Sequence, residues 1–122
     1  LGNTLEDAIK RSKSYVESGA DGIMIHSKES SGSDIKLFCE KFREFNKETP
    51  IIVVPSTFNH IRETEFIKWG INIVIYANHM LRSSYPSMLN VAKSILMNER
   101  SSESDDLCMP IKEILTLIPG TK

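Results

Sequence analysis

The sequence predicts an α/β fold in which short parallel strands alternate with amphipathic helices. Three short apolar runs, at 23–25, 51–54 and 71–76, have the length and the residue types of buried strands. Segments with a helical spacing of apolar residues precede, separate and follow these runs. Neighbouring runs are far enough apart for one crossover helix between them, which makes the strands parallel.

The first two helices are predicted by their capping residues and by the spacing of their apolar side chains. Thr4 is expected to be the N-cap of the first helix, with Asp7 in the capping-box position, and Gly19 is expected to stop it. Ser33 is expected to cap the second helix. The inner faces of the two helices are predicted to hold Leu5, Ala8, Ile9, Ser12, Tyr15 and Val16 in the first, and Ile35, Phe38, Cys39, Phe42 and Phe45 in the second.

The remaining elements follow from the same signals. A helix is expected at about 61–69, ended by Gly70, and a longer one at about 81–96. Pro86 must lie in the first turn of the longer helix or kink it. Segment 101–106 is expected to be a solvated linker, and Pro110 opens a last helix over 111–118. The inward side of the long helix is expected to hold Leu81, Tyr85, Met88, Leu89, Ala92, Ile95 and Leu96.

Three strands alone do not make a complete domain of this class. An open sheet of three buried strands leaves two bare apolar edges, and a flavodoxin-like domain has five strands. A (β/α)8 barrel takes about 250 residues, whereas this chain has 122. We therefore expect residues 1–100 to form the C-terminal half of a TIM-type barrel, and residues 101–122 to form a linker and a short C-terminal helix.

Composition excludes several classes of function. The net charge is −1, and no basic run indicates a nucleic-acid partner. No apolar run approaches the ~20 residues that cross a bilayer. Cys39 and Cys108 lie in no zinc-like or Cys-x-x-Cys pattern, so both are expected to be free thiols in a reducing, cytoplasmic compartment. The sequence starts without a signal peptide or an initiator Met, and we expect it to begin within something longer.

The candidate functional residues follow the strands, because chemistry in parallel α/β folds sits at the carboxyl ends of strands. The three predicted ends carry His26–Ser27, Pro55–Phe58 and Ala77–His79. His26 is the strongest candidate, since an imidazole can donate a hydrogen bond to a phosphoryl, phosphonate or carboxylate oxygen. The alternative is a structural histidine bonded to a loop carbonyl.

The other polar residues at these ends have simpler explanations. Asn78 is expected to cap the helix that follows it. Ser56 and Thr57 lie in no Gly-x-Ser-x-Gly elbow that would make either a nucleophile. No cluster of Asp, Glu or His has the spacing of metal ligands. The sequence patterns alone therefore leave His26 as the main candidate.

Five segments together resemble the phosphoenolpyruvate phosphomutases, a family of barrels in the isocitrate lyase-like superfamily. The resemblance rests on the order and spacing, along nearly the whole chain, of the segments YVESGADGIMIHSK (15–28), SDI (33–35), PIIVVP (50–55), GINIVIYANH (70–79) and IKEILTL (111–117). The family interconverts phosphoenolpyruvate and phosphonopyruvate, the entry step to phosphonate natural products. The resemblance implies the last three strands of the barrel, a small-molecule substrate, and no nucleic-acid or membrane partner.

The resemblance also implies roles for particular residues. His26 matches the family's histidine that contacts the phosphoryl group, and its neighbour Ser27 is a second substrate-binding candidate. The family's Mg2+-binding carboxylates, gating loop and phosphoryl-binding arginine precede the matched region. Mg2+ is therefore expected only in the complete enzyme, no catalytic residue or metal ligand is assigned here, and the chain alone is expected to be inactive. The family tends to have a tyrosine where this chain has Phe58.

The resemblance also implies an oligomeric state, and it leaves alternative functions open. In the family the final helix packs on a neighbouring subunit, so a homo-oligomer that exchanges the helix at 81–96 is expected. A phosphonopyruvate hydrolase or a related carbon–carbon lyase would share this half of the barrel. In such lyases a Pro-Glu pair tends to follow the strand that here ends in His26, and a glutamate there would repel a phosphoryl dianion. A half-barrel that serves only for assembly is an alternative of a different class.

Overall fold

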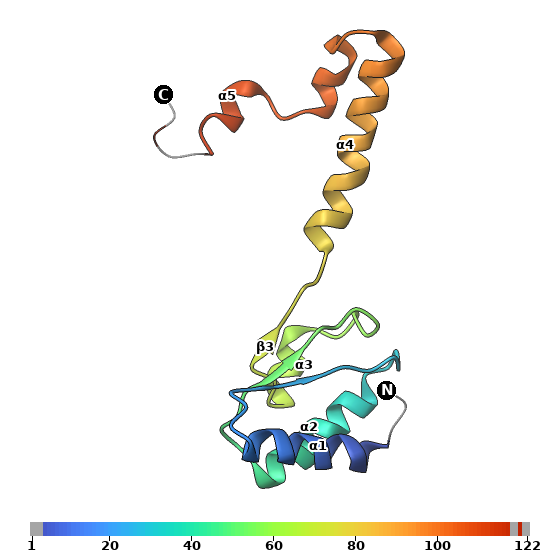
Figure 1. Ribbon diagram of the computed structural model, residues 1–122. Coiled ribbons are helices and arrows are strands. Elements are labelled where there is room, and N and C mark those ends of the chain that lie inside the picture. The colour runs from blue at the N-terminus through green and yellow to red at the C-terminus, as the bar shows by residue number, and fades with distance from the viewer. Residues whose placement is uncertain (1–3, 118–119, 121–122) are drawn as a thin grey trace. The chain divides into compact units, whose positions relative to one another are not determined.

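The computed structural model describes residues 4–117 and residue 120 (Figure 1). The chain divides into two compact units, Leu1–Ala77 and Asn78–Lys122, and each is described by itself.

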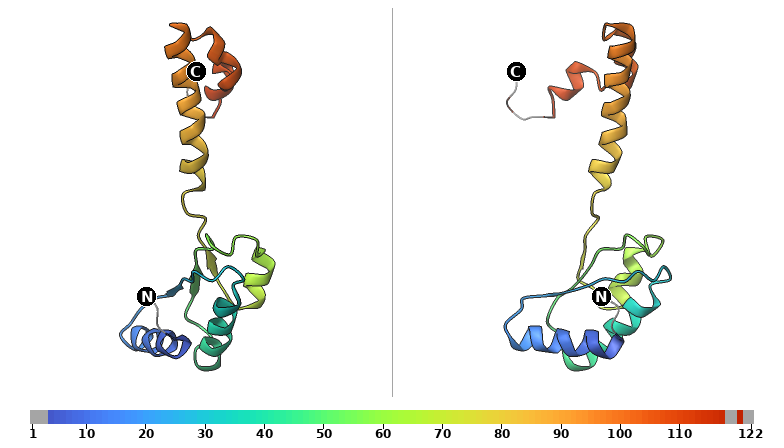
Figure 2. Two further views of the ribbon diagram at one scale, coloured as in Figure 1. Left: turned by 90° about the vertical axis from the view of Figure 1, so that its right-hand side faces the viewer. Right: turned by 45° about the vertical axis from the view of Figure 1, so that its right-hand side comes forward.

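The first unit alternates helices with parallel strands. In chain order its elements are α1 (Leu5–Glu17), β1 (Ile23–Ile25), α2 (Ser33–Phe45), β2 (Ile51–Val53), α3 (Glu63–Lys68) and β3 (Ile73–Val74). The strands pair in parallel in the order β1-β2-β3, and α1 and α2 lie side by side (Figures 1 and 2). The predicted fold class is confirmed: three parallel strands alternate with helices, as in part of an α/β barrel.

One face of the sheet is covered by helices and carries the core. Ile23, Ile51 and Val53 point to this face and are buried. They pack with residues from the helices and loops, namely Ile35, Phe38, Cys39, Phe42, Phe58, Phe66 and Ile71. Burial raises the pKa of the Cys39 thiol to about 12, because a thiolate is poorly solvated there. Both cysteines are free, as expected, and Cys108 is exposed.

The opposite face of the sheet is apolar and largely uncovered. The strand register places Met24 beside Ile52 and Ile52 beside Ile73, so these three side chains form a row on that face. Met24 is 57% exposed and Ile73 is 47% exposed. In a closed barrel this face would be the packed interior, which agrees with the expected half-barrel.

The cap of α1 is confirmed and that of α2 is not. Thr4 accepts a hydrogen bond from the Asp7 amide at 3.3 Å. The expected cap by Ser33 is wrong: Gly32 is the N-cap of α2, in a left-handed conformation with φ +73°. The Glu29 carboxylate instead accepts from the Ser33 amide at 3.3 Å, so a loop side chain satisfies a donor at the start of the helix.

Several expected bounds and faces differ from the structure. α3 spans Glu63–Lys68 and β3 only Ile73–Val74, so both are shorter than their apolar patterns. Tyr15 and Phe45 were expected inside, but they are exposed. Phe45 still meets the buried Phe42 ring edge-on at 4.8 Å. An apolar pattern therefore overestimates what the sheet and the neighbouring helices bury here.

The second unit is helical. It contains α4 (His79–Asn98), the 3-10 helix η1 (Ser102–Leu107), which contacts α4, and α5 (Ile111–Ile114). Pro86 lies inside α4, beyond its first turn. The expected solvated linker at 101–106 is wrong, because most of it forms η1 and Ser104 is buried. Pro110 is the N-cap of α5; residue 118, the expected end of that helix, lies outside the described residues.

The expected inner side of α4 is exposed. None of its twenty residues, all of which the structure describes, is buried. Leu89 is 38% exposed and Leu96 is 80% exposed, and Leu81, Tyr85, Met88 and Ile95 are exposed too. Within the second unit, the apolar residues of α4 are therefore left uncovered.

Arg43 ties the C-terminal end of α2 to the sheet. Its guanidinium lies over the Phe42 ring, with the central carbon Cζ 5.5 Å from the ring centroid. Its guanidinium donates four hydrogen bonds of 2.6–3.2 Å, to the carbonyl oxygens of Asn46, Thr49 and Gly70 and to the side-chain oxygen of Asn72. The same oxygen of Asn72 accepts from the Ile51 amide at 3.0 Å, so one side chain connects α2 with the starts of β2 and β3.

Replacing Arg43 should destabilise the first unit. Arg43→Met keeps the apolar stem but leaves four acceptors without their charged donor, and we expect a loss of about 2 kcal/mol in the free energy of unfolding. Trp69 is the only tryptophan and packs on Phe66 in this unit, so its fluorescence in a urea titration measures the effect. Lys41→Met is the control, since Lys41 is exposed and its nitrogen lies 3.9 Å from Glu6. Equal stability of the two variants would contradict this role.

Candidate functional site

The candidate site lies at the carboxyl ends of β1 and β2. The loop at 26–32 follows β1 and leads into α2, and the loop at 54–62 follows β2 and leads into α3. Because the two strands are parallel neighbours, both loops leave the same edge of the sheet. His26 and Ser27, predicted as site residues, are the first two residues of the first loop.

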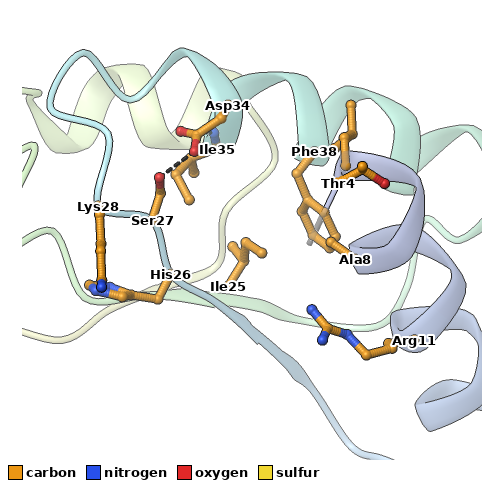
Figure 3. A pocket seen from close by; sticks show the side chains of 11 residues that line it. Thr4, Ala8, Arg11, Ile25, His26, Ser27, Lys28, Asp34, Ile35 and Phe38 are labelled. Atoms are coloured by element: carbon orange, nitrogen blue, oxygen red, sulfur yellow. Dashed lines mark hydrogen bonds between the residues drawn. The ribbon is translucent and has the colours of Figure 1, made fainter. Parts of the chain in front are cut away.

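His26 is exposed and lines a cavity of about 420 Å³ (Figure 3). No hydrogen bond or ion pair engages its side chain within the described residues. The cavity is lined by residues of α1, of the loop after β1 and of α2, namely Thr4, Leu5, Ala8, Arg11, Ile25, Ser27, Lys28, Asp34, Ile35 and Phe38. An imidazole with an open cavity beside it can donate to a ligand.

Positive charge predominates around this cavity. Arg11 reaches it from α1, and Lys28 comes from the same loop as His26 (Figure 3). Neither cation forms an ion pair in the part of the chain that the structure describes. The only carboxylate among the lining residues is that of Asp34, which accepts hydrogen bonds from the chain itself. Such a lining favours an anionic ligand.

Ser27 is held by its own loop. Its hydroxyl donates to Oδ2 of Asp34, drawn as a dashed line in Figure 3. It also accepts from the Glu29 amide at 3.0 Å. The second oxygen of Asp34 accepts from the Ile35 amide at 2.8 Å. The hydroxyl of Ser27 is thus engaged with the start of α2 in this structure.

Thr57 joins the second loop to the first. Its hydroxyl donates to the carbonyl oxygen of Ser27 at 2.8 Å, across thirty positions of sequence. Neither Thr57 nor Asp34 is predicted as a site residue from the sequence. The sequence gives no signal for this bond, because it depends on how two separate loops fold.

The remaining predicted residues lie elsewhere. Phe58 is fully buried, and its ring meets that of Phe66 at 6.1 Å, so this aromatic position belongs to the core. Asn78 and His79 belong to the second unit. Asn78 occupies the N-cap position of α4 with φ 65°, but its side chain makes no capping bond, contrary to the expectation.

Tyr76, which the sequence does not single out as a site residue, follows β3 and is hydrogen-bonded to the start of α3. The phenol of Tyr76 donates to Glu63, at the start of α3, at 2.6 Å. That hydrogen bond raises the pKa of Tyr76 above its ordinary value, because the carboxylate favours the protonated phenol.

Neither a metal site nor a membrane span is found among the described residues. No three or more His, Cys, Asp or Glu side chains at positions 4–117 and 120 are placed to hold a metal ion. The donors present therefore do not fit a resident Mg2+. Within the same residues, each helix is too short or too polar to cross a bilayer.

Comparison with known proteins finds relatives over almost the whole chain. The chain is 34% identical over 113 residues to a phosphoenolpyruvate phosphomutase of Tetrahymena pyriformis, an alignment that covers 93% of this chain and 37% of that protein. A crystal structure of phosphoenolpyruvate phosphomutase from Streptomyces platensis subsp. rosaceus matches with a TM-score of 0.82 at 29% identity, over 95% of this chain and 39% of that one.

A second activity occurs among the similar structures. The crystal structure of a phosphonopyruvate hydrolase in complex with oxalate and Mg++ matches with a TM-score of 0.79 at 28% identity, over 93% of this chain and 40% of that one. The chain thus spans little more than a third of the length of the relatives it matches. The model of the family described as phosphoenolpyruvate phosphomutase matches residues 1–96, which include the strand end at His26 and the loop around Thr57. On this evidence the chain belongs to the phosphoenolpyruvate phosphomutase family.

Proposed function

We propose that this chain supplies the C-terminal part of a phosphoenolpyruvate phosphomutase, which interconverts phosphoenolpyruvate and phosphonopyruvate in phosphonate biosynthesis. In this proposal His26 donates a hydrogen bond to the phosphoryl group as it moves between oxygen and carbon. One observation carries the proposal: an exposed histidine that follows β1 is among the lining residues of a cavity, together with two cations that form no ion pair within the described residues.

The chemistry explains why these groups suit the role. A transferring phosphoryl group is strongly anionic, and a donor fixed in place stabilises charge that develops on it. Arg11 and Lys28 would add a favourable potential at the cavity without contacting the reacting atoms. Among the described residues, neither Ser56 nor Thr57 has a base partner that would make it a nucleophile, and in this proposal the chain contributes binding and electrostatics.

Magnesium belongs to the complete enzyme in this proposal. The related phosphonopyruvate hydrolase structure contains Mg++, whereas the described residues here form no metal site. When bound, the ion would act as a Lewis acid on substrate oxygens. Its ligands would come from outside this chain.

Phosphonopyruvate hydrolysis is the second candidate. The similarity to the hydrolase, 28% identity with a TM-score of 0.79, is close to that of the phosphomutase structure. Both activities would need a donor to the phosphoryl group, so His26 fits either. A non-catalytic assembly module would have no need for that donor.

A cytoplasmic location is also part of the proposal, supported by the two free cysteines.

Assembly through α4 is a further part of the proposal. We infer a homo-oligomer in which α4 packs on a neighbouring copy. Its support is the run of large apolar side chains on α4 that the second unit by itself leaves exposed, Leu81, Tyr85, Met88, Leu89, Ile95 and Leu96 among them. Such a surface is what an interface between copies would bury.

A hybrid enzyme tests the function. The part of the Tetrahymena pyriformis phosphomutase that precedes the matched region is joined to residues 1–122 of this chain. We expect conversion of phosphonopyruvate to phosphoenolpyruvate in the presence of Mg2+, followed by 31P NMR, and no conversion by either part alone. Release of inorganic phosphate would favour the hydrolase. A folded hybrid without turnover, while the intact relative is active, would favour the assembly module.

Substitutions of His26 test the site in the same hybrid. Losing a donor to developing charge costs ~3–4 kcal/mol, so His26→Ala should lower turnover ~100- to 1,000-fold. His26→Asn keeps a donor and should lose less. The melting temperature should change little, because the side chain is exposed. His60→Ala, at an exposed histidine of the second loop, is the control. If His26→Ala melts early but its folded fraction turns over normally, His26 is a structural residue.

Charge on α4 tests the assembly. Leu89→Asp and Leu96→Asp each place a carboxylate in the proposed interface, and we expect the oligomer to dissociate in sedimentation velocity runs, because a buried unpaired charge is costly. The fluorescence of Trp69 should report an intact first unit. Asn90→Asp adds the same charge at the next position of the helix, which is exposed, and is the control. An unchanged oligomer in the leucine variants would refute the proposed exchange.

A further inference from the structure

We propose that Thr57 is a positioning residue for His26: through its hydroxyl it holds the backbone immediately after His26. This inference rests on the proposed function of His26 in phosphoryl binding. In this proposal the loop after β2 helps to fix the conformation of the loop after β1.

The hydroxyl of Thr57 is hydrogen-bonded to the backbone carbonyl of Ser27. Thr57 donates to it at 2.8 Å, and this carbonyl belongs to the residue that directly follows His26. The side chain of Ser27 is fixed at the same time by Asp34 and by the Glu29 amide. The backbone beside His26 is therefore tied on one side to α2 and on the other to the loop after β2.

The end of the 26–32 loop also packs on the loop after β2. Gly32 packs so closely on the loop after β2 that an added Cβ would lie 2.4 Å from Cδ1 of Ile61 and 3.6 Å from Cβ of Phe58. Its φ of +73° also excludes most side chains. Phe58, next to Thr57, is buried and anchors the loop after β2 in the core. The loop carrying His26 thus contacts the second loop at Ser27 and at Gly32.

His26 depends on this support, because its own side chain has no partner within the described residues. The direction of the imidazole is then set by the backbone and by its rotamer. A misplacement of about 1 Å can cost on the order of 100-fold in rate where geometry matters. A bond that fixes the adjacent peptide is therefore expected to affect turnover, although Thr57 touches neither the substrate nor the imidazole.

Two substitutions of Thr57 separate the hydroxyl from the shape of the side chain. In the hybrid enzyme, Thr57→Val keeps the shape and removes the donor, and Thr57→Ser keeps the donor. Ser56→Ala is the control, since Ser56 is exposed and its hydroxyl makes no bond within the described residues. The measurements are hydrogen–deuterium exchange of the peptide at 26–33, melting temperature, kcat and KM.

We expect Thr57→Val to speed exchange at 26–33 and to lower kcat about 10-fold, with a melting temperature close to that of the unsubstituted hybrid. Thr57→Ser should restore both the exchange rate and kcat, and Ser56→Ala should change neither. Faster exchange with unchanged kcat would overturn the positioning role, provided that His26→Ala still lowers turnover ~100- to 1,000-fold. An unchanged exchange rate at 26–33 in Thr57→Val would show that the hydroxyl of Thr57 does not hold this loop.

Failure of the proposed function would look different. The unsubstituted hybrid would then lack turnover, or His26→Ala would leave turnover intact, whatever the state of Thr57. The exchange measurement needs no substrate and still decides whether the hydroxyl of Thr57 holds the loop.

Discussion

The parallel pairing of β1 with β2 is the constraint on which the rest of the first unit depends. The register of Ile23 with Ile51 and of Ile25 with Val53 aligns the side chains that face the helices, and the core forms on that face. The same pairing sends both following loops to one edge of the sheet. Only because those loops are neighbours can the hydroxyl of Thr57 lie 2.8 Å from the carbonyl of Ser27.

The sequence was sufficient for the identity and order of these elements, because strands and helices leave different apolar periods. It was less reliable on which faces are covered. The stripe on α4 has a helical period, which predicts an inner face, yet the structure leaves Leu89 and Leu96 exposed. Periodicity shows that a face is apolar and says nothing about what covers it. The polar composition of the segment at 101–106 predicts a linker, whereas most of this segment forms η1, which packs against α4.

For the site, the sequence predicts a position along the chain. His26 follows β1, as its place at the end of an apolar run indicates, and its role in phosphoryl binding stays a prediction. Thr57 and Asp34 could not be found in this way. Their bonds to Ser27 depend on the conformation of two loops, which a left-handed Gly32 and a buried Phe58 help to fix. No spacing in the sequence encodes such a contact.

The uncovered row of Met24, Ile52 and Ile73 has a thermodynamic consequence. Whatever protein surface covers these side chains binds the folded sheet and not the unfolded chain. Folding of the first unit would then be linked to that association by mass action, and its measured stability would rise with the concentration of the covering surface. The midpoint of unfolding would in that case describe a mixture and not the chain alone.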